Sequence, residues 1–233
     1  MIHEFTVLVY KRILGTKLVS IQSNNYNTIE NTENIEKIKI TWSVEIMREI
    51  KYEGYYWQNE KVRLRAMDEP DWEGHYYNRY DTPARRLLNY EVELPPTPQE
   101  AKDMIEHFKN FKEGSGRLMF SIENLEGVTV GGINLNSIDE RNGTFSIGMQ
   151  VDRDHRGKGY GTAAMDIVLG YAFNERRLNK YYGAVLKGNI PSETMLKKLG
   201  CLEEGRRRQM VYTDGKYHDE ILFGLLKEDY MKL

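Results

Sequence analysis

The chain has 233 residues, and its 33 lysines and arginines nearly balance its 35 aspartates and glutamates, with an isoelectric point near 6.3. This balance, without a long basic cluster, argues against a nucleic-acid partner. The lone cysteine, Cys201, excludes an intramolecular disulfide and agrees with a reducing cytoplasm. No apolar run reaches the roughly eighteen residues of a membrane span, and residues 2–13 lack a signal-peptide cleavage site. We therefore expect a soluble cytoplasmic protein.

The first 57 residues carry no recognisable chemistry. Two β-rich runs, Phe5–Tyr10 and Lys17–Ile21, flank Gly15 and predict a hairpin. The polar, asparagine-rich stretch 23–34 predicts an exposed loop, whereas residues 35–56 fit a strand and a helix about equally well. We predict an N-terminal β-rich extension, residues 1–57, with a structural role, and a main domain over residues 58–233.

The main domain opens with a strand and a helix. Alternating apolar residues predict a strand over Val62–Met67, and the acidic turn Asp68–Asp71, which contains Pro70, predicts a helix start. Aromatic and acidic side chains recur through the helical segment. They are Tyr76, Tyr77, Tyr80, Asp71, Glu73 and Asp81.

A proline-rich segment, Leu94–Pro98, must be extended, and Thr97 with Glu100 then fits a helix N-terminus. The apolar stripe of this helix consists of Ala101, Met104, Ile105 and Phe108, and glycines 114 and 116 are expected to end it. Strands are predicted over Leu118–Ile122, Thr129–Ile138 and Thr144–Val151, with turns at 126–127 and 139–143.

A glycine-rich loop, Arg156–Thr162, joins the last of these strands to a helix whose apolar stripe starts at Ala164. Three glycines in five positions allow a tight turn and leave backbone N–H groups exposed at a helix N-terminus, where anions bind. The basic Arg156 and Lys158 favour an anionic ligand. The spacing does not fit a Walker loop, because Lys158 precedes the last glycines, nor a dinucleotide fingerprint, which wants Gly at Thr162.

The C-terminal part predicts a strand, a short helix and a hairpin. The strand covers Tyr181–Leu186, and the helix after Asn189 turns Met195, Leu196 and Leu199 inward and is closed by Gly200. Two strands, Leu202–Thr213 and Tyr217–Leu226, flank the turn dipeptide Asp214-Gly215. The succession predicts an α/β fold, with a mixed central sheet of about six to seven strands flanked by helices.

The pattern Arg156-x-x-Gly159-x-Gly161, between a strand and a helix, resembles the acyl-CoA loop of the GCN5-related N-acetyltransferases (GNAT family). Downstream positions resemble the ribosomal-protein-alanine and polyamine acetyltransferases of that family. These positions are Asn189, Ser192, Leu196, Lys198, Leu199, Gly200, Glu204, Gly205, Arg208, Gly215, Tyr217 and Asp219. The resemblance covers roughly residues 60–230, and it implies the GNAT fold, acetyl-CoA as cosubstrate, no metal, and direct transfer of an acetyl group to a primary amine.

The resemblance also implies roles for individual residues. Donor binding falls to Met149, Gln150 and Val151 at the splayed strand end, to Arg156, Gly157, Lys158, Gly159, Tyr160, Gly161 and Thr162 in the loop, and to Asn189 and Ser192. Ser192 is the candidate acid or thiol contact, or else only a first-turn helix residue. The candidate bases are Glu123, Asp152 and Asp219, although a water relay would need none of them. His155 is expected to shape the loop rim.

The acceptor stays open at this stage between a protein N-terminus, an aminoglycoside and another small amine. The segment around Tyr76–Asp81 is either a solvated amphipathic helix or a wall of the acceptor cleft. Leu196 stands where the polyamine enzymes carry a tyrosine, which favours the alternative of a non-catalytic acyl-CoA-binding module. A purely structural domain would not need the glycine loop. Dimers are common in the family, so a homodimer is a further expectation.

Overall fold

The computed structural model describes residues 50–111 and 116–233. The predicted hairpin at 5–21, the polar loop at 23–34 and residues 35–49 of the ambiguous stretch 35–56 lie outside the described residues, and residues 50–56 form neither a helix nor a strand. Within them the strands are β1 Val62–Arg65, β2 Leu118–Asn124, β3 Thr129–Asp139, β4 Thr144–Val151, β5 Lys180–Leu186, β6 Leu202–Thr213 and β7 Lys216–Leu226. The α-helices are α2 Trp72–Asn78, α3 Thr82–Asn89, α4 Pro98–Lys109, α5 Tyr160–Gly170, α6 Ile190–Lys198 and α7 Lys227–Tyr230.

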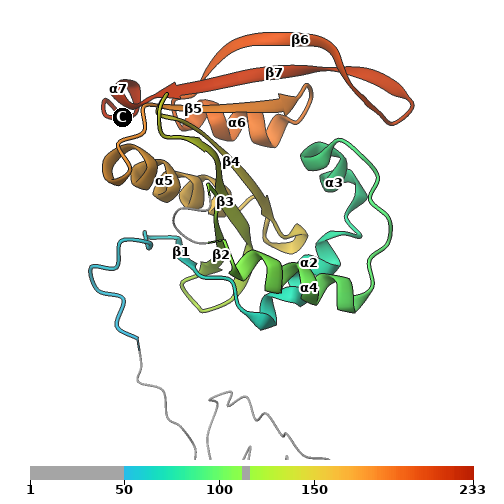
Figure 1. Cartoon of the computed structure of the whole chain (residues 1–233), viewed down its shortest axis with the longest axis vertical. Coiled ribbons are helices and arrows are strands. Elements are labelled where there is room, and N and C mark those ends of the chain that lie inside the picture. The colour runs from blue at the N-terminus through green and yellow to red at the C-terminus, as the bar shows by residue number, and fades with distance from the viewer. Residues whose placement is uncertain (1–49, 112–115) are drawn as a thin grey trace, which may run out of the picture. The chain divides into compact units, whose positions relative to one another are not determined.

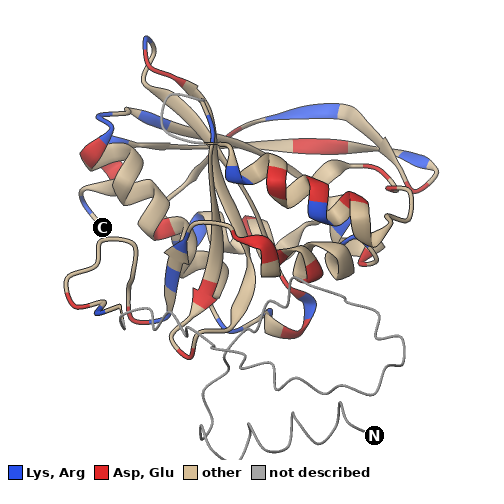
Figure 2. Ribbon diagram, turned by 60° about the horizontal axis from the view of Figure 1, so that its bottom comes forward, with Lys and Arg blue, Asp and Glu red and all other residues tan. Residues whose placement is uncertain are grey.

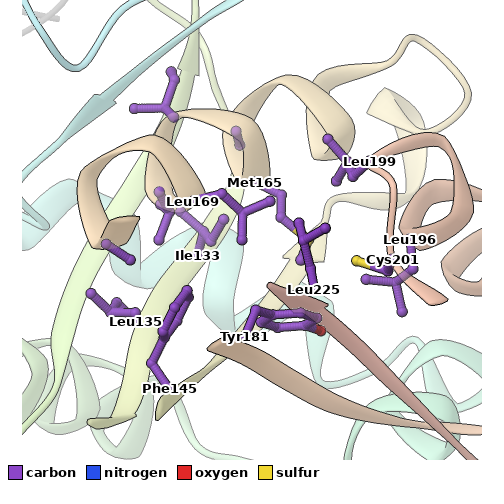
Figure 3. Packing of buried hydrophobic residues seen from close by; sticks show 14 of the residues in the cluster. Ile133, Leu135, Phe145, Met165, Leu169, Tyr181, Leu196, Leu199, Cys201 and Leu225 are labelled. Atoms are coloured by element: carbon purple, nitrogen blue, oxygen red, sulfur yellow. The ribbon is translucent and has the colours of Figure 1, made fainter. Parts of the chain in front are cut away.

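The seven strands form one sheet in the order β1-β2-β3-β4-β5-β7-β6 (Figure 1). All neighbours are antiparallel except β4 and β5, which are parallel. Helices α5 and α6 supply the helical part of a core that packs on the sheet through Ile133, Phe145 and Leu225 (Figure 3). The predicted mixed α/β class with a central sheet of six to seven strands is confirmed.

The other face of the sheet carries α2 and α3. On β3 and β4, side chains alternate between the faces: Met149 contacts Gly161 of α5, whereas the neighbouring Gln150 reaches Arg85 of α3. His75 of α2 lies beside Gly132, on that second face as well. The sheet is therefore the middle layer of three.

Side-chain caps begin α3, α4 and α6. Thr97 and Glu100 form the predicted capping box of α4, with Thr97 Oγ1 accepting from the Glu100 N–H at 3.2 Å. The helix ends at Lys109, before the predicted stop at glycines 114 and 116. Asn110 explains the early end, because its Nδ2 donates to the carbonyl of Glu106 at 2.9 Å and competes with the backbone ladder.

Helix α3 was not predicted from the sequence as a separate element. Asp81 accepts from the Ala84 N–H at its start, and Pro83 occupies the first turn. The triplet Asp81-Thr82-Pro83 is thus the local signal that could have revealed it. A π-helical turn, Tyr171–Glu175, extends α5 and was also missed.

Candidate active site

The parallel strands β4 and β5 separate after two paired positions. Thr144 pairs with Lys180 and Phe145 with Tyr181, yet β4 continues to Val151 and β5 to Leu186. The two strands diverge in Figure 1. The rest of each strand therefore presents an unpaired backbone edge toward the opening between them.

The register with β3 shows which groups of β4 face this opening. The N–H of Asp152 donates to the Val130 carbonyl at 2.9 Å, and antiparallel pairs alternate, so Gln150 also faces β3. Met149 and Val151 consequently direct their backbone groups into the opening. The predicted place of Gln150 among them is corrected: its backbone belongs to the β3 ladder, while its side chain accepts from Arg85 Nη1 at 2.7 Å.

The same reasoning applies to β5. The N–H of Lys187 donates to the Asp219 carbonyl at 3.0 Å, so every second residue from Lys187 is bonded to β7. The residues between them, Tyr182, Ala184 and Leu186, face the opening. Ala184 is exposed. The opening is therefore lined by backbone donors and acceptors from both strands.

The glycine loop closes the β4 end of the opening. Gly157 has φ +76° and Gly159 φ +84°, conformations that favour glycine. Gly159 is the N-cap of α5 and offers no side chain, so the first N–H groups of α5 are left for another acceptor. A Cβ on Gly161 would lie 3.4 Å from Val151 Cγ2 and 3.5 Å from Met149 Sδ, which shows how closely α5 approaches β4.

Arg156 is engaged with the protein. Its Nε donates to the Val151 carbonyl at 2.9 Å, and its Nη2 lies 2.7 Å from Asp81 Oδ2. The pKa of Asp81 is lowered to about 2, mainly by the hydrogen bond from Arg153. Burial of the carboxylate acts in the opposite direction, whereas Arg156 lowers the pKa further. Arg156 therefore ties the loop to the strand end and to the start of α3. Its predicted contact with an anionic ligand stays a prediction.

A basic residue that the sequence did not single out stands over the loop. The Nζ of Lys61 is 3.2 Å from the point at which a Cβ on Gly159 would lie. Lys61 precedes β1 and is almost a hundred residues away in the chain, and no local pattern marks it. It adds positive charge where the helix N-terminus already favours an anion.

At α6 the predicted donor-binding pair takes different positions. Asn189 is the N-cap, with its Oδ1 accepting from the Ser192 N–H at 3.3 Å, which leaves the amide nitrogen for other partners. Ser192 is partly exposed in the first turn. Leu196 is only 3 % exposed and belongs to the core with Leu199 and Cys201 (Figure 3). Cys201 is buried, and burial raises its pKa to about 12.

The candidate bases lie apart from one another. Glu123 is on β2, two strands from the opening, and its carboxylate pairs with Arg63 at 2.5 Å and Arg65 at 2.9 Å. As a base it is therefore corrected to a structural ion-pair partner.

The other two acidic candidates and His155 lie nearer the site. Asp152 accepts from Asn78 Nδ2 at 2.7 Å, and Asp219 accepts from the Gln209 N–H at 3.0 Å. His155 is partly exposed between β4 and the glycine loop, in keeping with a rim position. None of these contacts places a free carboxylate in the opening.

Helix α3 and the β6–β7 hairpin face each other across a cleft of about 390 Å³. It is lined by Arg86, Tyr90, Glu91, Val92, Tyr212, Thr213, Asp214 and Gly215. The Tyr90 hydroxyl reaches Glu220 Oε1 at 3.1 Å and the Ala184 carbonyl at 3.4 Å, so this cleft borders the opening. Sequence reasoning missed both Tyr90 and Glu220, because nothing local connects them. Outside the cleft, lysines and arginines are interspersed with aspartates and glutamates along the helices and strands (Figure 2).

The glycine loop thus places an uncapped helix N-terminus, which favours an anion, at the end of the opening between β4 and β5. A family model described as the acetyltransferase (GNAT) domain matches residues 61–202, which is more than half of the chain. The chain therefore belongs to the GNAT family and is an acetyltransferase.

Named relatives agree with this family. The SPbeta prophage-derived uncharacterized N-acetyltransferase YokL of Bacillus subtilis is 29% identical over 175 residues, or 75% of this chain and 95% of that protein. The structure of spermidine N-acetyltransferase from Vibrio cholerae with CoA and spermine has a TM-score of 0.65 at 20% identity, covering 74% of this chain and 99% of that one. The ribosomal L7/L12 α-N-protein acetyltransferase RimL, with CoA, has a TM-score of 0.64 at 17% identity, covering 72% and 95%. These two likenesses show the fold.

Residues 50–111 and 116–233 contain no helix that is long and apolar enough to cross a membrane. They also contain no group of three or more His, Cys, Asp or Glu side chains arranged to hold a metal ion.

Proposed function

We propose that this protein transfers the acetyl group of acetyl-CoA directly to a primary amine. The observation that carries the proposal is the opening between β4 and β5, which ends at an uncapped helix N-terminus formed by the glycine loop. The free N–H groups at Gly159–Thr162 and the nearby Lys61 fit a pyrophosphate. The inward-facing N–H groups of Met149 and Val151 fit an amide-bearing arm and a carbonyl.

When bound, acetyl-CoA supplies the thioester that is to be cleaved. The N–H of Met149 would donate to the carbonyl oxygen of the acetyl group and stabilise the charge that develops there. As the amine nitrogen forms its bond to the acetyl carbon and the carbon–sulfur bond breaks, Ser192, in the first turn of α6, would donate its hydroxyl proton to the leaving sulfur. The proton that the amine nitrogen loses would then return to Ser192, directly or through water. The amide nitrogen of Asn189 would donate to the arm of the donor while its Oδ1 holds the helix.

Both structural neighbours named above contain CoA, which supports the same donor here. Their names give a polyamine and a ribosomal protein as acceptors, and both classes present an amino group. Under this proposal the α3 side of the sheet receives the acceptor, because the cleft there borders the opening. The cytoplasmic location, the homodimer and the boundary at residues 57/58 stay predictions.

The second candidate is an acyl-CoA-binding module without turnover. It is favoured by Leu196, which is buried in the core at a position where a tyrosine would supply an acid. Calorimetric titration with acetyl-CoA, followed by a free-thiol release assay, separates the two. We expect binding and amine-dependent thiol release. Binding without release from spermine, an aminoglycoside or a peptide with a free N-terminus would favour the module, and absence of binding would contradict both.

A paired substitution tests the loop itself. Gly159→Asp places a carboxylate at the proposed pyrophosphate site, and we expect a loss of acetyl-CoA affinity of about 10-fold to 100-fold, the range of a lost charge-assisted hydrogen bond. Gly127→Asp is the matched control, because Gly127 has nearly the same φ, +83° against +84°, and open space around it in a distant turn. Equal affinities for the two folded variants would contradict the proposed site. A bulky residue at Gly161 is less suitable, since it would separate α5 from β4.

A further inference from the structure

Tyr90 ends α3 in a conformation that bulky side chains rarely adopt. Its φ is +66°, and its N–H donates to the Arg86 carbonyl at 3.0 Å. Tertiary contacts must hold a non-glycine residue in this region. Here those contacts are made by the hydroxyl, which lies against β5 and β7 at the opening.

The hydroxyl has one proton and two neighbouring acceptors. Glu220 Oε1 is at 3.1 Å and carries charge, whereas the Ala184 carbonyl oxygen is at 3.4 Å and is neutral. The shorter, charge-assisted hydrogen bond is the stronger, so the proton points to Glu220. The remaining lone pairs of Tyr90 Oη are then directed away from Glu220.

Ala184 is exposed, and its backbone carbonyl faces the opening because the bonded residues of β5 are those that alternate with it. Two oxygen acceptors therefore converge from opposite walls: Tyr90 Oη from α3 and the Ala184 carbonyl from β5. An amino group brings two or three N–H donors to such a place.

The charged group that contacts Tyr90 directly is the carboxylate of Glu220, while Arg86 lines the adjoining cleft. Glu220 is 5 % exposed, and its Oε2 accepts from Arg207 Nη1 at 2.9 Å. The Arg207 side chain is 53 % exposed, so water screens its positive charge more than that of the buried carboxylate. Burial, reinforced by Glu220, raises the pKa of Tyr90, so that the phenol stays neutral at ordinary pH.

We propose that Tyr90 Oη and the Ala184 carbonyl together receive the amino group of the acceptor, and that Glu220 positions Tyr90 for this contact. The inference rests on the proposed function and assigns the acceptor side of the same site. Tyr90 orients the nitrogen toward the opening and forms no covalent bond. Glu220 acts through Tyr90 and is a positioning residue.

The test compares Tyr90→Phe with Tyr55→Phe in the full chain, using spermine, an aminoglycoside and a peptide with a free N-terminus as acceptors. Tyr55 is a matched control, because its hydroxyl also donates to a strand carbonyl, Leu64 at 3.3 Å, but on β1. For any acceptor that the wild type acetylates, we expect Tyr90→Phe to raise KM about 10-fold or more. The affinity of Tyr90→Phe for acetyl-CoA should be unchanged. The KM of the control Tyr55→Phe for the amine should also equal that of the wild type.

Glu220→Gln, alone and combined with Tyr90→Phe, distinguishes a positioning role from a merely structural one by the KM for the amine. If Glu220 acts through the hydroxyl, its effect on the KM for the amine should largely disappear in the Tyr90→Phe background. If the effects of Glu220→Gln and Tyr90→Phe on the KM for the amine are additive, the positioning role of Glu220 is overturned. If Tyr90→Phe has the KM of the wild type, the contact between Tyr90 and the amine is overturned, while the proposed function stands. A wild type that binds acetyl-CoA and acetylates no acceptor would overturn the proposed function, and this inference with it.

Discussion

At the first turn of α6, helix capping and the proposed proton transfer are divided between two residues. Asn189 accepts from the Ser192 N–H, so the serine hydroxyl is not needed to start the helix. Sequence reasoning left both roles open for Ser192. The structure assigns the capping to Asn189, and Ser192 remains partly exposed for chemistry.

Replacing Ser192 by alanine tests this division. We expect turnover to fall about 100-fold, the lower range for loss of an acid catalyst, with acetyl-CoA affinity and melting temperature nearly unchanged. Steady-state kinetics and calorimetry on the same preparation measure these quantities. Thr194→Ala is the control, because Thr194 is an exposed hydroxyl residue on the same helix. If the two variants turn over equally, Ser192 is an ordinary helix residue.

At the scale of the element, α6 is held to the core by its apolar face. Leu196 is 3 % exposed and packs in the cluster that includes Leu199 and Cys201. The structure agrees with the sequence prediction that this helix turns Met195, Leu196 and Leu199 inward. It also agrees that Gly200 closes the helix in the left-handed conformation, with φ +80°. Leu196 thus has a packing role that accounts for an apolar residue at this position.

Leu196→Ala should lower the free energy of unfolding by about 2–4 kcal/mol, because it removes buried methyl groups and leaves a cavity. In a domain of this size that corresponds to a fall in melting temperature of roughly 4–15 °C. Thermal and urea unfolding measure it. Lys197→Ala, on the exposed side of the same turn, should change the midpoint little. A loss as small as that of the control would contradict the packing role.

At the scale of the whole molecule, a half-buried histidine lies between the helical layer and the sheet. His75 of α2 approaches Gly132 of β3, and its ring centroid is 6.0 Å from that of Phe108 on α4. Burial lowers the pKa of His75, and the positive charge of Arg85 lowers it further. The negative charges of Asp71 and Asp152 raise it, but by less than burial lowers it. In the unfolded chain the pKa of a histidine is about 6.5.

Stability should therefore fall with acidification. Below about pH 6.5 the unfolded chain binds a proton at His75 more readily than the folded chain, so the free energy of unfolding decreases as the pH drops. We expect His75→Gln to reduce this slope between pH 7.5 and pH 5.5, measured by urea unfolding. His107→Gln, at an exposed position on α4, is the control. A slope for His75→Gln equal to that of the wild type would contradict the assignment.

The sequence by itself determined the elements whose signals are local. The strand, glycine loop and helix around Arg156–Thr162, the capping box at Thr97 and the turn at Gly200 depend on residues within a few positions of one another. Periodicity and capping chemistry act over that range, which is why the fold class and the family could be predicted. Helix α3 has such a signal too, in the triplet Asp81-Thr82-Pro83.

Only the tertiary structure decided how the site is assembled. The divergence of β4 from β5 depends on the packing of two strands whose paired residues, such as Thr144 and Lys180, are 36 positions apart, and it directs the backbone of Met149 and Val151, but not of Gln150, into the opening. Lys61, Tyr90 and Glu220 come from three distant segments and meet the opening through long-range contacts. The same contacts engage Arg156 and Glu123 in ion pairs. Local sequence patterns do not predict these long-range contacts, because the contacts depend on the register and packing of the whole sheet.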